Sequence, residues 1–300
     1  MNKIPVGETI SGTYGFAFAG FLSILGIVWL PYVVLLVFSA GVIYLVAPDL
    51  PGHVMRGEFD ATTFYGVWRV AGLIGLASLV VRAMVTVGLQ ERALGQIQGP
   101  PFFFFSLGAR VWLMIAAVFL AILSIVLIVL LTAGVTAAAA YAAVKFVPNF
   151  GKAIAVILCI VASCWIIYAC VRLTFFLPAV VVAEERIGLG RSWELGGGNF
   201  WRIFAVMFVV FVPVAIGLGI VQNAVMGPFM PMAFVSHDFR PGMTPGEMAD
   251  AYNAMIKGFL LHIRGALPFF IVFGFIQELI YLGLGNGAVG KAYLAVTGKG

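Results

Sequence analysis

Charge is the scarcest property of this sequence. Only 10% of its 300 residues are charged and 63% are hydrophobic, whereas a soluble domain carries about 25% charged residues. A globule of this composition would not have enough polar side chains to cover its surface. The composition therefore excludes a water-soluble fold.

Catalytic and metal-binding motifs are missing as well. The sequence contains no H-E-x-x-H, C-x-x-C, P-loop or G-x-S-x-G pattern, the spacings that assemble common catalytic and metal sites. The glycine string Gly285-Asn-Gly-Ala-Val-Gly290 ends an apolar segment and follows no strand, so we expect it to pack and terminate a helix. The three cysteines share one apolar segment and are expected to behave as small hydrophobic residues. We predict a protein that is not an enzyme and holds neither cofactor nor metal.

Long charge-free runs dominate what is present. The longest are Thr9–Pro48, Val111–Val144 and Ile203–His237, and a membrane-spanning helix needs about 20 apolar residues. The sequence therefore predicts an all-α integral membrane protein that forms a single polytopic domain over residues 1–300. Its six spans are expected near residues 16–46, 66–89, 111–144, 153–182, 203–226 and 265–288.

The distribution of basic residues sets the orientation. If both termini lie on one side, that side receives ten of the 17 Lys and Arg residues, which favours cytoplasmic termini by the positive-inside rule. The net charge of +5 comes from residues scattered at segment ends. This pattern favours contact with the phospholipid bilayer, anionic lipid included, over binding of nucleic acid.

The connection over residues 227–264 on the opposite side contains a helix start. Thr244 and Glu247 have the spacing of a capping box, and Pro245 occupies the first helical position. Apolar residues such as Met248 and Tyr252 then recur on one face. We expect an amphipathic helix that lies at the membrane interface or over the mouth of the bundle.

A faint internal repeat divides the chain. Residues 13–21 align without gaps with residues 192–200, and each copy runs into an apolar span that contains a proline, Pro31 or Pro213. Glu91-Arg92 similarly echoes Glu185-Arg186. The sequence predicts three units, 1–89, 90–183 and 184–300, each with a cytoplasmic elbow and two helices. Chance similarity between apolar stretches of low diversity is the alternative.

Ionisable residues recur in the second span of each unit, as Arg82, Arg172 and Glu278. Leaving such groups in lipid costs several kcal/mol on insertion scales, so we expect an intramembrane charge cluster. One interpretation is a structural clamp that fixes helix register. The other is a site for an ion, a proton or an anionic head group, because two arginines against one glutamate leave a positive charge.

The polar stretch from Glu184 to Arg202 forms the third elbow. It is expected to lie on the cytoplasmic leaflet with Trp193 and Trp201 as interface anchors. Alternatively, Gly196–Gly198 provides a hinge, with further breaks in the spans at prolines such as Pro31, Pro178 and Pro213. As a surface for a membrane partner, the elbow offers Arg191, Ser192, Trp193, Asn199, Phe200 and Trp201.

One segment resembles a known sequence pattern. It comprises Arg172, Pro178, Glu184-Glu185, Arg191-Ser-Trp, Leu195 and Gly198-Asn-Phe-Trp201. This pattern is similar to that of uncharacterised bacterial six-span proteins, the YciC-like family and the membrane domain of some glycerophosphodiester phosphodiesterases. The chain has Gly196-Gly197 where that family usually has a polar or basic residue. The resemblance implies a multi-pass protein of the bacterial inner (plasma) membrane and carries over no catalytic residue.

The leading functional prediction is a non-catalytic inner-membrane protein that organises lipid or binds a membrane-protein partner. The alternative is a small transporter or channel with a buried Arg/Glu site at Arg82, Arg172 and Glu278.

Overall fold

The computed structural model describes residues 2–50, 52, 61–97, 103–147, 149–226, 242–248, 250–252 and 267–298. The described chain is helical. In chain order the elements are α1 (Val6–Tyr14), the π-helical turn η1 (Gly15–Ala19), α2 (Phe21–Val46), α4 (Ala61–Ala93), α5 (Ala109–Phe146), α6 (Gly151–Thr174), α7 (Leu177–Glu184), α8 (Leu189–Gly196), α9 (Phe200–Met226) and α11 (Leu267–Thr297).

Within the described ranges, six helical segments are long and apolar enough to cross a membrane. They are Phe21–Val46, Phe64–Ala93, Ala109–Phe146, Gly151–Glu184, Phe200–Ala224 and Pro268–Thr297. The predicted all-α fold with six spans is thereby confirmed, and the chain is a multi-pass membrane protein. Large apolar side chains such as Leu36, Phe119 and Ile160 are exposed along these helices, as on a surface that faces lipid tails.

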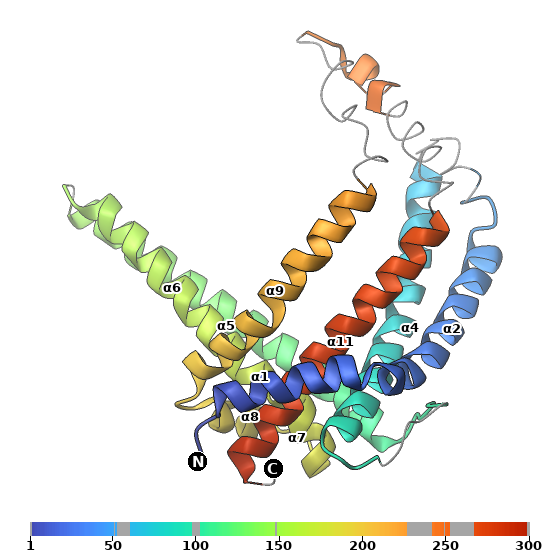
Figure 1. Cartoon of the computed structure of the whole chain (residues 1–300). Helices are drawn as coiled ribbons and strands as arrows, with labels where there is room; N and C mark the ends of the chain where they lie inside the picture. Colours follow the sequence, from blue (N-terminus) through green and yellow to red (C-terminus); the bar gives the residue numbers. More distant parts are fainter. Residues whose placement is uncertain are drawn as a thin grey trace.

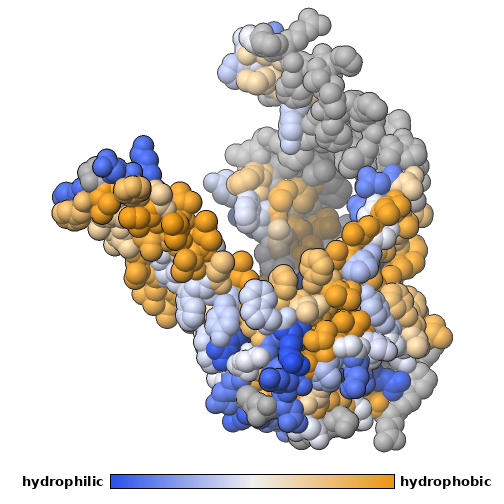
Figure 2. All heavy atoms as spheres, turned by 60° about the vertical axis from the view of Figure 1, so that its left-hand side comes forward, coloured by the Kyte–Doolittle hydropathy of each residue, from blue (hydrophilic) through white to orange (hydrophobic). Residues whose placement is uncertain are grey.

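The long helices diverge from one end of the molecule, which we call the base (Figure 1). Helices α1, α7 and α8 lie at the base together with both termini, while the hairpin of α5 and α6, the arm, leans away from the other spans. Figure 2 shows hydrophilic side chains gathered at the base and an open hollow between the hydrophobic arm and the rest of the bundle. Both termini therefore lie at one end, and their cytoplasmic location stays a prediction.

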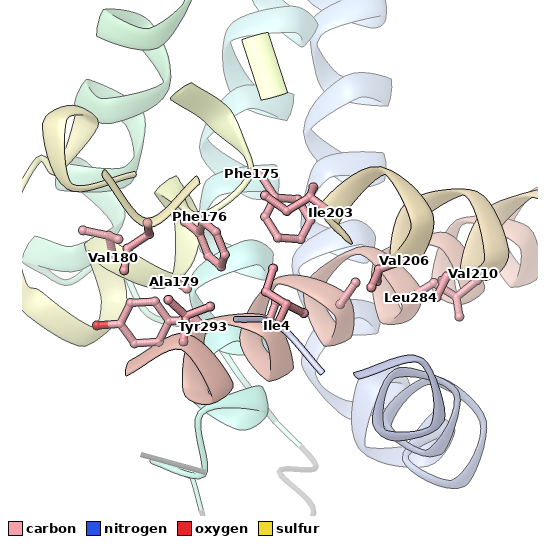
Figure 3. Close-up of a cluster of buried hydrophobic side chains, with 14 of the residues drawn as sticks. Ile4, Phe175, Phe176, Ala179, Val180, Ile203, Val206, Val210, Leu284 and Tyr293 are labelled. Atoms are coloured by element: carbon pink, nitrogen blue, oxygen red, sulfur yellow. The ribbon is translucent and has the colours of Figure 1, made fainter. Parts of the chain in front are cut away.

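A compact apolar cluster holds the base together (Figure 3). Ile4 from the N-terminal segment packs in one cluster with Phe176, which precedes α7, Ile203 of α9 and Leu284 of α11, and all are almost fully buried. The chain before α1 is thus part of the core, although it lies far from its partners in sequence.

Two glycines in α11 allow close packing at the base. A Cβ at Gly287 would lie 3.3 Å from Cβ of Phe16, and one at Gly290 would lie 2.6 Å from Cβ of Ala93. The expectation that this glycine string ends the sixth span near residue 288 is wrong, because α11 continues to Thr297. The glycines pack the helix against η1 and α4 without terminating it.

Two other span boundaries also differ from expectation. The first span begins at Phe21, since η1 and a turn at Gly20 precede it; a Cβ at Gly20 would lie 2.3 Å from the Phe16 carbonyl oxygen. The fourth span is divided between α6 and α7, and Pro178 lies in the first turn of α7, where a proline is tolerated.

The alternative prediction of breaks at Pro31 and Pro213 is wrong, because α2 and α9 continue through these prolines.

Each elbow packs against the second span of another unit. Helix α8 packs against α6, while α1 and η1 pack against α11. In the second unit, Phe104 lies against α4, since a Cβ at Gly88 would be 2.7 Å from its ring. These contacts are compatible with a cyclic arrangement of three units, and the repeat itself stays a prediction.

The capping box in the long connection is confirmed. The backbone N–H of Thr244 donates to Oε2 of Glu247 at 2.7 Å, and the Glu247 N–H donates to Oγ1 of Thr244 at 3.3 Å. The hydrogen bonds from Thr244 lower the pKa of the Glu247 carboxyl. Most of the connection 227–264, including the second half of its predicted amphipathic helix, lies outside the described residues.

Candidate functional site

Helices α4 and α11 pack together through two polar pairs. Nη2 of Arg82 lies 3.9 Å from Oε1 of Glu278. Eight residues later on each helix, from 82 to 90 and from 278 to 286, Nε2 of Gln90 donates to Oδ1 of Asn286 at 3.0 Å. Eight helical residues rise about 12 Å. The two pairs thus fix the register of α4 against α11, as interhelical polar contacts do in membranes.

The amide pair near the base is deeply buried. Gln90 has no exposed surface, and its Oε1 has no hydrogen-bond partner in the described chain. If the Gln90 amide were rotated by 180°, Oε1 would face the backbone carbonyl oxygen and Oδ1 of Asn286. The Nε2 group of Gln90 now donates to these two acceptors. The pair therefore holds one fixed orientation despite the unsatisfied oxygen, which costs about 1–3 kcal/mol.

The charged pair lies in the wall of a cavity of about 830 Å³. This volume falls within the range of about 300–1,000 Å³ that is typical of small-molecule sites. Helices α2, α4, α5, α7 and α11 all contribute to the lining, which is mostly apolar. Its residues are Tyr32, Leu35, Gly75, Ser78, Leu79, Val81, Arg82, Ala83, Thr86, Met114, Ile115, Val118, Pro178, Gly274, Phe275 and Glu278.

Hydrogen-bond donors are in excess inside this cavity. The Arg82 side chain is 70% exposed, and at 3.9 Å its contact with Glu278 is too long for a hydrogen bond. Within the described chain Arg82 donates no hydrogen bond, although a guanidinium carries five N–H donors. The Tyr32 hydroxyl already donates to Oε1 of Glu278 at 3.0 Å. The arrangement can therefore accept a negatively charged group that is rich in hydrogen-bond acceptors.

Arg172, the third member of the predicted charge cluster, has other partners. Its Nε and Nη2 donate to the Trp193 carbonyl oxygen at 3.1 and 2.6 Å, and its Nη1 donates to the Tyr168 hydroxyl at 2.8 Å. The guanidinium also lies 4.1 Å from the centroid of the Trp193 ring, in cation–π geometry. The structure thus brings together Arg82 and Glu278, and uses Arg172 to join α6 to the elbow helix α8.

The glycines of the elbow make room for Arg172. A Cβ at Gly196 would lie 3.2 Å from Cγ of Arg172, and one at Gly197 would lie 3.0 Å from its Nη2. Gly198 has a φ of +73°, which a residue with a side chain rarely adopts. The three glycines lie at the end of α8 and in the turn to α9, and the absence of side chains at Gly196 and Gly197 leaves space for Arg172.

Two of the predicted elbow residues face inward. The Ser192 hydroxyl donates to the Arg172 carbonyl oxygen at 3.0 Å, and Oδ1 of Asn199 accepts the Ile4 backbone N–H at 3.1 Å. Nη1 of Arg202 donates to the Ile4 carbonyl oxygen at 2.7 Å. Because Ser192 and Asn199 are buried, these side chains hold the N-terminal segment and α6 and are not offered to a partner.

Phe200 and Trp201 line a second cavity, of about 770 Å³, between α6 and α9. Its other aromatic members include Trp165 and Tyr168, and the Trp201 side chain is 76% exposed. Trp and Tyr rings concentrate at membrane interfaces, where one edge is wet and the other apolar. This location near the base fits the predicted interface anchor.

Salt bridges connect the elements of the base. Arg191 pairs with Glu184 and Glu194, both at 3.3 Å. Burial lowers the pKa of Arg191, but hydrogen bonds to the two carboxylates outweigh this effect and raise it above its ordinary value.

A second network joins three helices through one arginine. Arg110, at the start of α5, contacts Glu91 of α4 and Glu185 after α7, each at 2.6 Å. These glutamates are the two that the repeat places in equivalent positions, and the structure directs both to one guanidinium. The base of the arm is thereby held to α4 and α7.

Sequence reasoning missed Tyr32, Gln90 and Asn286. Tyr32 follows a proline within an apolar span, where a hydroxyl needs a polar partner. Gln90 and Asn286 each follow an ionisable residue by eight positions, and this matched spacing was the available signal for a shared helix interface.

Compared with protein-family models, curated proteins and solved structures, the chain matches none. The resemblance to YciC-like proteins stays a prediction, and the chemistry of the cavity has to carry the functional conclusion.

Proposed function

We propose that this protein is a non-catalytic membrane protein that holds a lipid-like amphiphile in the cavity between α2, α4, α5, α7 and α11. One observation carries the proposal: Arg82, within the span Phe64–Ala93, lies in the wall of an apolar cavity with no hydrogen bond to the described chain. Arginine within a span is costly unless it is paired or solvated. The pair with Glu278, at 3.9 Å, leaves the N–H donors of Arg82 without an acceptor among the described residues, so an acceptor-bearing head group would stabilise it.

The shape of the site supports an amphiphilic ligand. Polar atoms of Arg82, Glu278 and Tyr32 gather at one part of the lining, and the remaining surface is formed mainly by aliphatic and aromatic side chains. The Ser78 hydroxyl donates to the Gly75 carbonyl oxygen of its own helix, and Glu278 is engaged by Tyr32, so neither group is set up as part of a nucleophile–base pair. These features favour binding over catalysis.

The alternative role, docking of a membrane-protein partner at the elbow, has less support. Ser192 and Asn199 are buried and form hydrogen bonds within the chain. Among the predicted elbow residues, Trp201 presents the largest exposed aromatic surface. An interface anchor explains this residue without a partner.

A small transporter is the second candidate. The observation that favours it is the divergence of the spans from the base, with a hollow between the arm and the rest of the bundle (Figure 2). Transfer of the bound amphiphile between leaflets in proteoliposomes would assign the protein to this class. Binding without transfer would assign it to the class of lipid-holding proteins.

Native mass spectrometry of the protein extracted gently with its own lipids tests the proposal. We expect a discrete bound mass on the wild type and loss of that mass in Arg82→Gln, because the variant removes the cationic donors from the cavity. Arg69→Gln is the matched control, since Arg69 lies on α4 but does not line this cavity. A bare wild-type protein, or equal retention in both variants, would contradict the proposal.

A further inference from the structure

We infer that the ligand is a single-chain amphiphile with a monoanionic head group, and that its binding takes up one proton at Glu278. The inference rests on the proposed function, since it specifies the ligand and the charge balance of the same cavity. It starts from the pair of Arg82 and Glu278, whose closest atoms are 3.9 Å apart.

Charge balance is the first step. Arg82 and Glu278 together are neutral before a ligand binds. A monoanion that accepts hydrogen bonds from Nη2 of Arg82 has its oxygens near Oε1 of Glu278, because that atom lies only 3.9 Å from Nη2. Two negative groups beside one cation in an apolar cavity repel each other, and one of them then favours its protonated form. Uptake of one proton from solution restores neutrality.

Glu278 is the group that can hold this proton. Among the described residues, the titratable groups that line the cavity are Tyr32 from α2, Arg82 from α4 and Glu278 itself from α11; the described lining residues of α5 and α7 carry none. Tyr32 donates to Oε1 of Glu278, which leaves the second carboxyl oxygen available for the proton. The resulting O–H can donate to the head group while Arg82 supplies its N–H groups from the other side.

The numbers of donors and acceptors favour an anion over a cation. A cationic ligand would have to displace Arg82 from Glu278 and would leave the guanidinium without an acceptor in an apolar wall. An anion satisfies that guanidinium and needs only a proton in exchange.

The size of the cavity indicates one acyl chain. Its volume of about 830 Å³ has to hold the head group as well as the apolar tail, and it lies within the range of about 300–1,000 Å³ found for small-ligand sites. Leu79, Ile115 and Phe275 provide the apolar wall for the chain. A lysophospholipid and a fatty acid share this chemistry.

Isothermal titration calorimetry of the detergent-solubilised full chain tests the inference. The probe is lysophosphatidylglycerol, whose phosphodiester keeps one negative charge at mildly acidic to alkaline pH. Titrations in buffers of different ionisation enthalpy report the protons exchanged. We expect uptake of about one proton per ligand and affinity that falls about tenfold per pH unit where this uptake is complete. Oleate, titrated in the same way, distinguishes a fatty acid from a lysophospholipid as the source of the anion. Lysophosphatidylcholine tests the acyl chain without a net negative charge, and diethyl phosphate tests the anion without the chain.

Glu278→Gln provides the decisive comparison. This variant keeps the shape and the Tyr32 contact but cannot exchange a proton, so it should bind lysophosphatidylglycerol without proton uptake and with affinity independent of pH. Wild-type binding with no proton exchange would overturn the inference and leave the proposed function intact. Equal affinity for lysophosphatidylcholine would overturn the inference that the ligand carries a monoanionic head group. Absence of binding by every amphiphile would overturn both the inference and the proposed function.

Discussion

Arg82 and Arg172 show how one residue type acquires two roles through its neighbours. Arg172 satisfies its donors with the Trp193 carbonyl and the Tyr168 hydroxyl and stacks on an indole ring. Arg82 has only a long contact with Glu278 and faces a cavity. A guanidinium whose three nitrogens all donate within the chain fixes structure, whereas one that donates no hydrogen bond to the described chain and lies in an apolar wall is available to a ligand.

Arg172→Lys tests the structural role. Lysine keeps the charge but loses the planar fork that reaches two acceptors and stacks on Trp193. We expect the free energy of unfolding to fall by about 1.5–3 kcal/mol, measured by thermal or denaturant unfolding in detergent. Arg69→Lys is the control, because Arg69 forms no ion pair or hydrogen bond within the described chain. An Arg172→Lys protein as stable as the Arg69→Lys control would refute the structural role of Arg172.

At the scale of helices, Tyr14 and Pro213 form a connected pair. Proline lacks an N–H, so Pro213 leaves the Val209 carbonyl oxygen without its usual helical donor. The Tyr14 hydroxyl donates to that oxygen at 2.8 Å. Helix α9 therefore continues through the proline, and α1 contacts α9 at the position where the helical hydrogen bond is missing.

A double-mutant cycle measures this connection. Tyr14→Phe should destabilise the protein by about 1 kcal/mol, since the Val209 oxygen loses its donor. In a Pro213→Ala background the alanine N–H can supply the missing helical bond, so the same Tyr14→Phe change should cost less. Equal costs in the two backgrounds, read from unfolding in detergent, would show that the proline and the hydroxyl act independently.

The sequence predicted the spans better than their contacts. Hydropathy alone located the six membrane helices, because apolar length is a property of each segment by itself. Whether Arg82, Arg172 and Glu278 meet depends on which faces of which helices pack, and long apolar runs with little periodicity do not specify this. The capping box at Thr244 was predictable because its partners are three residues apart. The pairing of Asn199 with Ile4 was not, since 195 residues separate them.

At the scale of the whole molecule, the long helices pack together at the base and diverge from it. The apolar cluster around Ile4 and Phe176, a second cluster that packs α2 against α4 and α11, and the salt bridges of Arg110 join the long helices near the termini. The arm then diverges, with apolar side chains such as Phe119 and Leu130 exposed along it. The cavity at Arg82 lies where α5 is still close to α4, so a ligand there would contact both the arm and the body.

Photolabelling with a diazirine-bearing fatty acid in proteoliposomes tests the central claim most directly. Adducts located by peptide mass spectrometry should concentrate on the cavity-lining segments 78–86, 114–118 and 274–278. Arg82→Gln should abolish them, and Arg69→Gln should leave them unchanged. Adducts spread over the exposed faces of α5 and α6, with the same pattern in all three proteins, would contradict a binding site at Arg82 and Glu278.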